Sequence, residues 1–144
     1  MRILMINGPN LNLLGLREPD IYGTQRLQDL EELITTHGEK LGVSIKCLQS
    51  NHEGELVDWI QMAFDKYDAI LINPAAYTHT SIAILDALKA VGLPAVEIHL
   101  SDINTREEFR KWSYPSLYCE KTIAGKGFQG YIEGLEYLVE KYSK

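Results

Sequence analysis

Short aliphatic runs alternate with stretches of helical spacing along the whole chain, and this alternation limits its possible folds more than any other feature. The central run, Ala69 to Asn73, is apolar up to its last residue, as expected for a strand that is buried on both faces. Repeated strand-helix units of this kind predict a parallel sheet. The expected strands cover residues 2–7, 43–48, 69–73, 94–99 and 117–123.

Apolar residues in the intervening segments recur every three or four positions, which predicts amphipathic helices. The first helix runs from Leu27 to Leu41, with Leu30, Leu33 and Ile34 on the same face. The second turns Leu56, Ile60, Ala63 and Phe64 inward, and the third begins among Thr78, His79, Thr80 and Ser81 and ends near Val91. Two more are expected over residues 106–112 and 127–142.

Five strands and about five helices predict a flavodoxin-like, doubly wound α/β fold, in which a five-stranded parallel sheet carries helices on both faces. The chain has 144 residues and shows no linker, so we expect one catalytic domain over residues 1–144. Ligands of such sheets bind outside the carboxyl ends of the strands. Candidate functional residues are therefore sought there.

Charge and hydropathy exclude two classes of partner. The net charge of −6 comes from scattered residues, and no Lys/Arg cluster is present to bind nucleic acid. No apolar run approaches the roughly 18 residues of a membrane helix, and the amino terminus lacks a signal-peptide core. We expect a soluble cytoplasmic protein. Cys47 and Cys119 form no CxxC pair and are expected to be reduced thiols.

Amides, imidazoles and hydroxyls gather at the predicted strand ends. Such short, directional and mostly neutral groups suit hydrogen bonding to a sugar-like polyol. They are Asn7 and Asn10 after the first strand, Ser50, Asn51 and His52 after the second, Asn73, Tyr77 and His79 after the third, and Glu97, His99 and Ser101 around the fourth.

Three of these residues, His52, His79 and His99, allow an alternative reading as a metal-dependent hydrolase. They come from three separate loops without an HExxH motif, which gives a metal site little support. The first strand is followed by Gly-Pro-Asn-Leu-Asn instead of a phosphate-binding glycine motif, which disfavours a nucleotide. A non-enzymatic, flavodoxin-like binding module is the second alternative.

The long first loop, residues 8–24, is typical of a lid that closes over a ligand. It contains Arg17 and Tyr22 between Gly15 and Gly23, and its four leucines indicate that part of it packs on the protein. A tyrosine, whose ordinary pKa is about 10, acts as a base only when its phenolate is stabilised. A cation about 4 Å away contributes roughly 4 kcal/mol, which lowers the pKa by ~3 units.

Glu97 and His99 are two residues apart on the fourth strand, so their side chains are expected to point the same way. A carboxylate there fixes the tautomer of the imidazole and keeps it protonated, as a general acid requires. Backbone amides near Leu100 and Ser101 are placed to hold a carboxylate.

Two further positions are ambiguous from spacing alone. Arg106 and Arg110 share a face of the short helix and pair equally well with Glu107 or Glu108. Asp86 reads as a solvated surface residue of the third helix.

Five motifs together resemble those of the type II 3-dehydroquinate dehydratases. They span nearly the whole chain in the order typical of that family. They are residues 7–15 with Arg-Glu-Pro at 17–19 and Tyr-Gly at 22–23; Gln-Ser-Asn-His-Glu-Gly-Glu at 49–55; Asn-Pro-Ala-Ala-Tyr-Thr-His-Thr-Ser at 73–81; Glu-Ile-His-Leu-Ser at 97–101 with Arg-Glu-Glu-Phe-Arg at 106–110; and Gly-Lys-Gly at 125–127 with Gly-Tyr at 130–131.

The resemblance implies anti elimination of water from 3-dehydroquinate to give 3-dehydroshikimate through an enolate, without metal or organic cofactor. This reaction serves the shikimate pathway of aromatic amino acid biosynthesis or the breakdown of quinate. The resemblance further implies that Tyr22 is the base and that Arg17 stabilises its phenolate. Asn10 would hold a water on the enolate oxygen, and His99, oriented by Glu97, would protonate the departing hydroxyl.

The remaining roles are also implied by the resemblance. Asp86 would reach from a neighbouring subunit towards the active site, which implies a trimer. In the family, four such trimers assemble into a dodecamer. The family's pattern is broken at Arg26, where Thr is common, and at Lys111, where His is common. The implied substrate-binding residues are Asn73, His79, Asp86, Leu100, Ser101 and Arg110.

Overall fold

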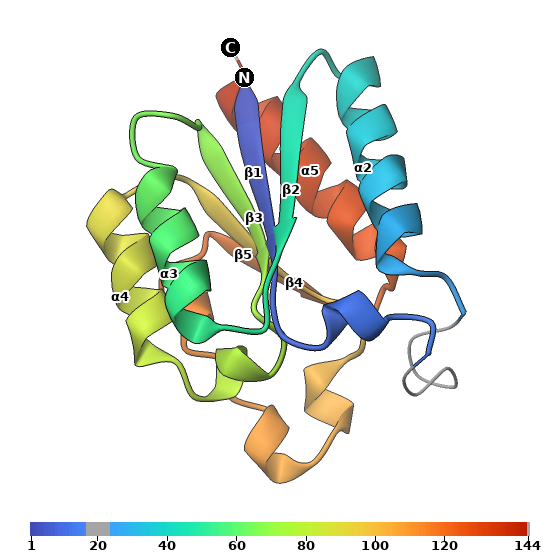
Figure 1. The fold of residues 1–144 in the computed structure, drawn as a ribbon, viewed down its shortest axis with the longest axis vertical. Coiled ribbons are helices and arrows are strands. Elements are labelled where there is room, and N and C mark those ends of the chain that lie inside the picture. The colour runs from blue at the N-terminus through green and yellow to red at the C-terminus, as the bar shows by residue number, and fades with distance from the viewer. Residues whose placement is uncertain (17–23, 144) are drawn as a thin grey trace.

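The structure is a computed structural model that describes residues 1–16 and 24–143. Its sheet has five parallel strands in the order β2-β1-β3-β4-β5, which confirms the predicted flavodoxin-like fold class (Figure 1). The strand order reverses between β1 and β3. The strands are β1 (Arg2–Asn7), β2 (Ser44–Gln49), β3 (Ala69–Asn73), β4 (Ala95–His99) and β5 (Lys121–Ala124).

Helices cover both faces of the sheet (Figure 1). Helices α2 (Leu27–Lys40) and α5 (Phe128–Tyr142) lie on one face, and α3 (Glu53–Met62) and α4 (Ile82–Val91) lie on the other. Strand β1 separates two apolar clusters, because successive side chains of a strand point to opposite faces. Ile3 and Met5 pack toward the first pair of helices, whereas Leu4 and Ile6 pack toward the second.

The inward faces of the helices follow the predicted spacing only in part. Leu30, Ile34, Leu56 and Ile60 are buried, and full burial of such side chains contributes about 1.5–3 kcal/mol each. Leu33, predicted to share the face of Leu30 and Ile34, is exposed, and so is Leu41 just after the helix. Phe64 is also exposed, since α3 ends at Met62 and the chain leaves the helical path at Asp65, where φ is 64°.

Most element boundaries lie within one residue of the prediction, but two elements differ more. Instead of a helix over residues 106–112, there is only the 3-10 turn η4 (Glu108–Arg110), and Arg106 before it is extended. The fifth strand begins at Lys121 instead of residue 117, because the preceding residues form the turn η5 (Pro115–Leu117). Helix α2 begins as predicted despite Arg26, whose backbone N–H donates to the Asp29 carboxylate at 2.9 Å.

Three further 3-10 turns follow strands and lie together at the carboxyl ends of the strands (Figure 1). They are η1 (Leu11–Leu13) after β1, η2 (Ala75–His79) after β3, and η3 (Ile103–Thr105) after β4. The register aligns the last residues of three strands, since Asn7 lies opposite both Gln49 and Asn73. Among the helices of residues 1–16 and 24–143, none is long and apolar enough to cross a membrane.

Candidate active site

A pocket opens at the carboxyl edge of the sheet, where the loops after β1, β3 and β4 meet. Its volume is about 670 Å³, including the open mouth. This is the position at which a doubly wound sheet binds its ligand. Most of the predicted site residues line it: Asn10, Asn73, His79, His99, Leu100, Ser101 and Arg110.

Other predicted residues lie elsewhere. Arg17 and Tyr22 fall among residues 17–23, outside the described part of the chain. Glu97 is completely buried behind His99 and does not line the pocket. Asp86 is exposed on α4. In the described part of the first loop, Leu11 and Leu14 are buried, whereas Leu13 and Leu16 are exposed.

Glu97 and His99 form a buried pair at the end of β4. Their side chains point the same way, as the alternation predicted, and Oε2 of Glu97 accepts a hydrogen bond from Nε2 of His99. His99 is only 5% exposed, at the edge of the pocket. Because Nε2 is held by the carboxylate, Nδ1 is the ring nitrogen left to exchange a proton with a ligand.

Three hydroxyl groups also bind the Glu97 carboxylate, and spacing in the sequence gave no sign of them. Thr78 Oγ1 donates to Oε2 at 2.7 Å, and Ser113 Oγ lies 2.8 Å from Oε1 and 2.7 Å from Oε2. Thr122 Oγ1 donates to Oε1 at 3.3 Å. Thr78 had been considered only as a helix cap, a role that Ser81 fills by accepting from the Ile84 N–H at 2.9 Å.

The surroundings of Glu97 favour its charged form. Burial on its own raises the pKa of this carboxyl group. The hydrogen bond and charge of His99, together with the hydroxyls of Ser113 and Thr78, lower the pKa by more than burial raises it. The net result is a pKa below the ordinary value. At neutral pH an ionised carboxylate therefore lies against the imidazole.

His79 reaches the pocket as a neutral acceptor. Its Nδ1 donates to the Trp112 carbonyl at 2.7 Å, which leaves Nε2 as the unprotonated nitrogen. Burial lowers the pKa of His79, and the neighbouring His99 and Arg110 lower it as well, against a raising effect of the Trp112 hydrogen bond. A substrate hydroxyl is a suitable donor to this nitrogen.

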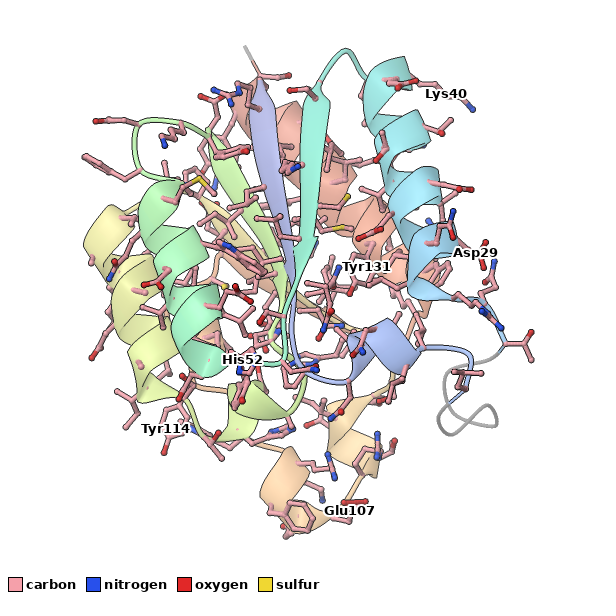
Figure 2. The ribbon with its side chains drawn as sticks, viewed as in Figure 1. Asp29, Lys40, His52, Glu107, Tyr114 and Tyr131 are labelled. Carbon is pink, nitrogen blue, oxygen red and sulfur yellow. The ribbon has the colours of Figure 1, made fainter. Side chains whose placement is uncertain are left out.

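Asn73 is oriented from inside the protein by Tyr131, the buried tyrosine labelled in Figure 2. Asn73 Nδ2 donates to the Tyr131 hydroxyl at 2.8 Å, and that hydroxyl donates to Asn7 Oδ1 at 2.6 Å. The Asn73 Oδ1 atom accepts from the Ala75 N–H at 3.0 Å. The second hydrogen on Nδ2 is thus the group that Asn73 offers to a ligand.

The Gln49–Asn51 motif holds the base of the first loop. Asn10 has a φ of 69°, and its N–H donates to Asn51 Oδ1 at 2.9 Å. Gln49 Nε2 donates to the Gly8 carbonyl at 3.1 Å, and the Tyr77 hydroxyl donates to the Asn51 carbonyl at 2.8 Å. The loop after β2 therefore fixes the position of Asn10 at the pocket.

Two arginines supply positive charge to the pocket wall. Arg110 Nε lies 2.5 Å from Glu107 Oε2, and Arg106 Nε lies 3.9 Å from Glu107 Oε1. Arg106 also donates to Ser101 Oγ at 3.3 Å. The prediction that the two arginines share a helix face was wrong, since Arg106 is extended. Both nevertheless line the pocket, where their charges favour an anionic ligand.

The histidines are not assembled as metal ligands in the described ranges. His79 and His99 line the pocket, whereas His52 is exposed at the start of α3 (Figure 2). No group of three or more His, Cys, Asp or Glu side chains in residues 1–16 and 24–143 is arranged to hold a metal ion. Cys47 and Cys119 are unpaired half-buried thiols.

Known proteins share both the sequence and the fold. The chain is 49% identical over 144 residues, the full length of both proteins, to the 3-dehydroquinate dehydratase of Clostridium acetobutylicum. It is 51% identical to that of Bartonella henselae, over 100% of this chain and 97% of the other. The crystal structure of a type II dehydroquinase from Butyrivibrio crossotus superimposes with a TM-score of 0.94 and 46% identity, covering 96% of this chain and 97% of the other. The family model described as Dehydroquinase class II matches residues 1–139, and the chain therefore belongs to this family.

Proposed function

We propose that this hydro-lyase, a 3-dehydroquinate dehydratase of the shikimate pathway, works by anti elimination through an enolate. The observation that carries the mechanism is the buried Glu97–His99 pair at the edge of the pocket. The pair supplies an oriented proton donor at a pocket that is also lined by asparagine amides, the imidazole of His79 and two arginines. Such a pocket suits an anionic polyol.

His99 is the general acid of the proposed mechanism. The hydroxyl group leaves as water only if it gains a proton as its carbon–oxygen bond breaks. Nδ1 of His99 gives up this proton while Nε2 stays bonded to Glu97. The carboxylate stabilises the imidazolium before the transfer and fixes the direction of the ring.

Tyr22 is the proposed base, with Arg17 stabilising its phenolate. The proton beside a ketone is weakly acidic, so its removal requires a tuned base and a stabilised enolate oxygen. We assign enolate stabilisation to a water held by Asn10, whose backbone is fixed at the pocket by Asn51. These assignments rest on the family resemblance, on the physical need for a cation near the phenolate and, for Asn10, on its place in the pocket wall.

The substrate groups are assigned to pocket residues by their hydrogen-bonding character. We place the substrate carboxylate against the Leu100–Ser101 backbone. Asn73 donates from Nδ2, and His79 accepts a hydroxyl proton at Nε2. Arg110 completes the set from the turn η4 between β4 and β5.

Asp86 and the assembly belong to the same proposal. Asp86 is exposed on α4, where its carboxylate is accessible to another molecule, and we assign it by family resemblance to the site of a neighbouring subunit. We propose trimers that assemble into a dodecamer in the cytoplasm. Light scattering on the protein as it elutes from a size-exclusion column measures the mass of the assembly directly. A monomeric mass would contradict the proposed dodecamer.

The proposed reaction is tested by absorbance. 3-Dehydroshikimate is a conjugated enone, so purified protein mixed with 3-dehydroquinate should give a growing ultraviolet absorbance. The rate should be unchanged by a chelator or by borohydride, because neither a metal nor a Schiff base is involved. No absorbance change with active, folded protein would refute the function, and loss of activity with chelator would favour the metal-dependent alternative.

A further inference from the structure

The carboxylate of Glu97 is saturated with hydrogen-bond donors. A carboxylate offers about four acceptor positions. They receive His99 Nε2, Thr78 Oγ1 at 2.7 Å, Ser113 Oγ at 2.7 and 2.8 Å, and Thr122 Oγ1 at 3.3 Å. The donors come from β4, η2, β5 and the segment before η5, so the site is assembled from distant parts of the chain.

Ser113 is held so that its hydroxyl proton is directed at Glu97. The side chain is buried, and its oxygen accepts the Ser116 N–H at 3.2 Å. With that acceptor position used, the proton lies between the two carboxylate oxygens. Ser116 in turn donates its hydroxyl to the Ser113 carbonyl at 2.7 Å, which fixes the turn.

The segment around Ser113 is also tied to the substrate side of the pocket. The Trp112 carbonyl accepts from His79 Nδ1 at 2.7 Å, and the Tyr114 N–H donates to the Thr78 carbonyl at 2.9 Å. Residues 112–114 therefore bind η2 on both sides of Ser113. A shift of this segment changes both the support of Glu97 and the orientation of His79.

We propose that Ser113 is a positioning residue for the dehydration, which together with Thr78 keeps Glu97 ionised and aimed at His99. To accept a proton, Glu97 would have to displace one of these donors, because its acceptor positions are filled. A carboxylate without them is free to rotate or to become protonated, and the imidazole then loses its partner. The inference rests on the proposed role of His99 as the acid.

The charged and titratable neighbours of Glu97 support a direct pH test. Among the described residues, the titratable groups that interact electrostatically with it are His99 on β4, His79 on η2 and Cys119 before β5. Burial raises the pKa of Cys119, so this thiol stays neutral in acid, and burial keeps His79 largely neutral near pH 7. The pKa of Glu97 itself lies below the ordinary value despite its burial.

The first test compares Ser113→Ala with the wild-type enzyme. Loss of a hydrogen bond to a buried charge should lower kcat roughly 10- to 100-fold and move the acid limb of the kcat profile upward by about one pH unit. KM should change by less than about threefold, since Ser113 does not line the pocket. Ser113→Thr keeps the hydroxyl and should restore the wild-type acid limb. Ser44→Ala removes an exposed serine hydroxyl at the start of β2, which is separated from β4 by two strands, and its profile should match the wild type.

The second test does not depend on turnover. In ¹⁵N-histidine-labelled protein without substrate, Nε2 of His99 should carry a proton directed at Glu97 and give one sharp signal. In Ser113→Ala the Nε2 proton signal should broaden or shift, because its carboxylate acceptor is less well held. An inactive wild-type enzyme would refute the proposed function while leaving this spectroscopic test intact.

The inference is overturned if folded Ser113→Ala has the wild-type kcat, acid limb and His99 signals. If that variant does not fold, Thr78→Val replaces it, since Thr78 donates to the same carboxylate at 2.7 Å. Thr78→Val should shift the acid limb in the same direction. A wild-type profile in Thr78→Val would also overturn the inference.

Discussion

The hydroxyl group of Tyr131 joins the pocket residue Asn73 to the interior, accepting from Asn73 Nδ2 at 2.8 Å. Tyr131 is fully buried on α5, and burial raises the pKa of its phenol, so it remains a neutral donor. It donates to Asn7 Oδ1 at 2.6 Å. A residue of the C-terminal helix thus sets the direction of an amide at the end of β3.

Tyr131→Phe should therefore affect both stability and substrate binding. The change leaves Asn7 Oδ1 and one Asn73 hydrogen without a partner, which costs roughly 1–3 kcal/mol of unfolding free energy. KM should rise several-fold, because Asn73 is no longer held. Urea unfolding and steady-state kinetics measure the two effects. Tyr137→Phe, which removes a surface hydroxyl bonded to Glu120, is the control; equal effects of the two changes would contradict the role of Tyr131.

The contact between Asn51 and Asn10 predicts a loop effect without a large stability effect. Asn51→Ala removes the acceptor for the Asn10 N–H but lies on the surface. We expect kcat/KM to fall about tenfold, a loss of about 1.4 kcal/mol, with a melting temperature close to the wild type. The adjacent exposed residue supplies the control, since His52→Ala should keep activity within about twofold. A large loss in His52→Ala would instead point to the metal-site reading.

Two glycines give opposite predictions for substitution by alanine. A Cβ atom at Gly8 would lie 2.4 Å from the Pro74 carbonyl oxygen, so backbone must move, and Gly8→Ala should destabilise the protein by about 1–3 kcal/mol or more. A Cβ atom at Gly54 meets nothing within 4 Å. Gly54→Ala in α3 should stabilise by about 0.5–1 kcal/mol. Thermal unfolding of both variants checks this, and a tolerated Gly8→Ala would show that the β1 and β3 loops are not closely packed.

The ionised state of Glu97 predicts how stability depends on pH. Its folded pKa is lowered, so its contribution is complete above the ordinary carboxyl pKa of about 4.3 and is lost as the pH falls toward the folded value. The unfolding free energy of the wild type should therefore drop below about pH 5. Glu97→Gln should be less stable at neutral pH and show a flatter acid dependence. Parallel pH curves for the two proteins would mean that other carboxylates cause the drop.

The strand pattern predicted the fold, since strands buried on both faces leave a continuous apolar signal. It also predicted the Glu97–His99 pair, because alternation along one strand is a local property. The hydroxyls of Ser113 and Thr122 could not be found this way. They reach Glu97 from other segments, and a serine or threonine in a loop or at a strand start has no distinguishing spacing. The exposed Phe64 shows the opposite error, in which helical spacing continues past the end of the helix.

If Tyr22 is the base, replacing it should change the catalytic rate without changing ligand affinity. Tyr22→Phe removes only the ionisable hydroxyl, so kcat should fall at least 10²- to 10⁴-fold, the range typical of a lost general base. The dissociation constant for 3-dehydroshikimate, measured by calorimetry, should stay within about threefold, because the pocket groups Asn73, His79 and Arg110 remain. Tyr142→Phe, at the exposed end of α5, is the matched control. A normal rate in Tyr22→Phe would remove Tyr22 from the mechanism, whereas loss of product binding would make it a binding residue.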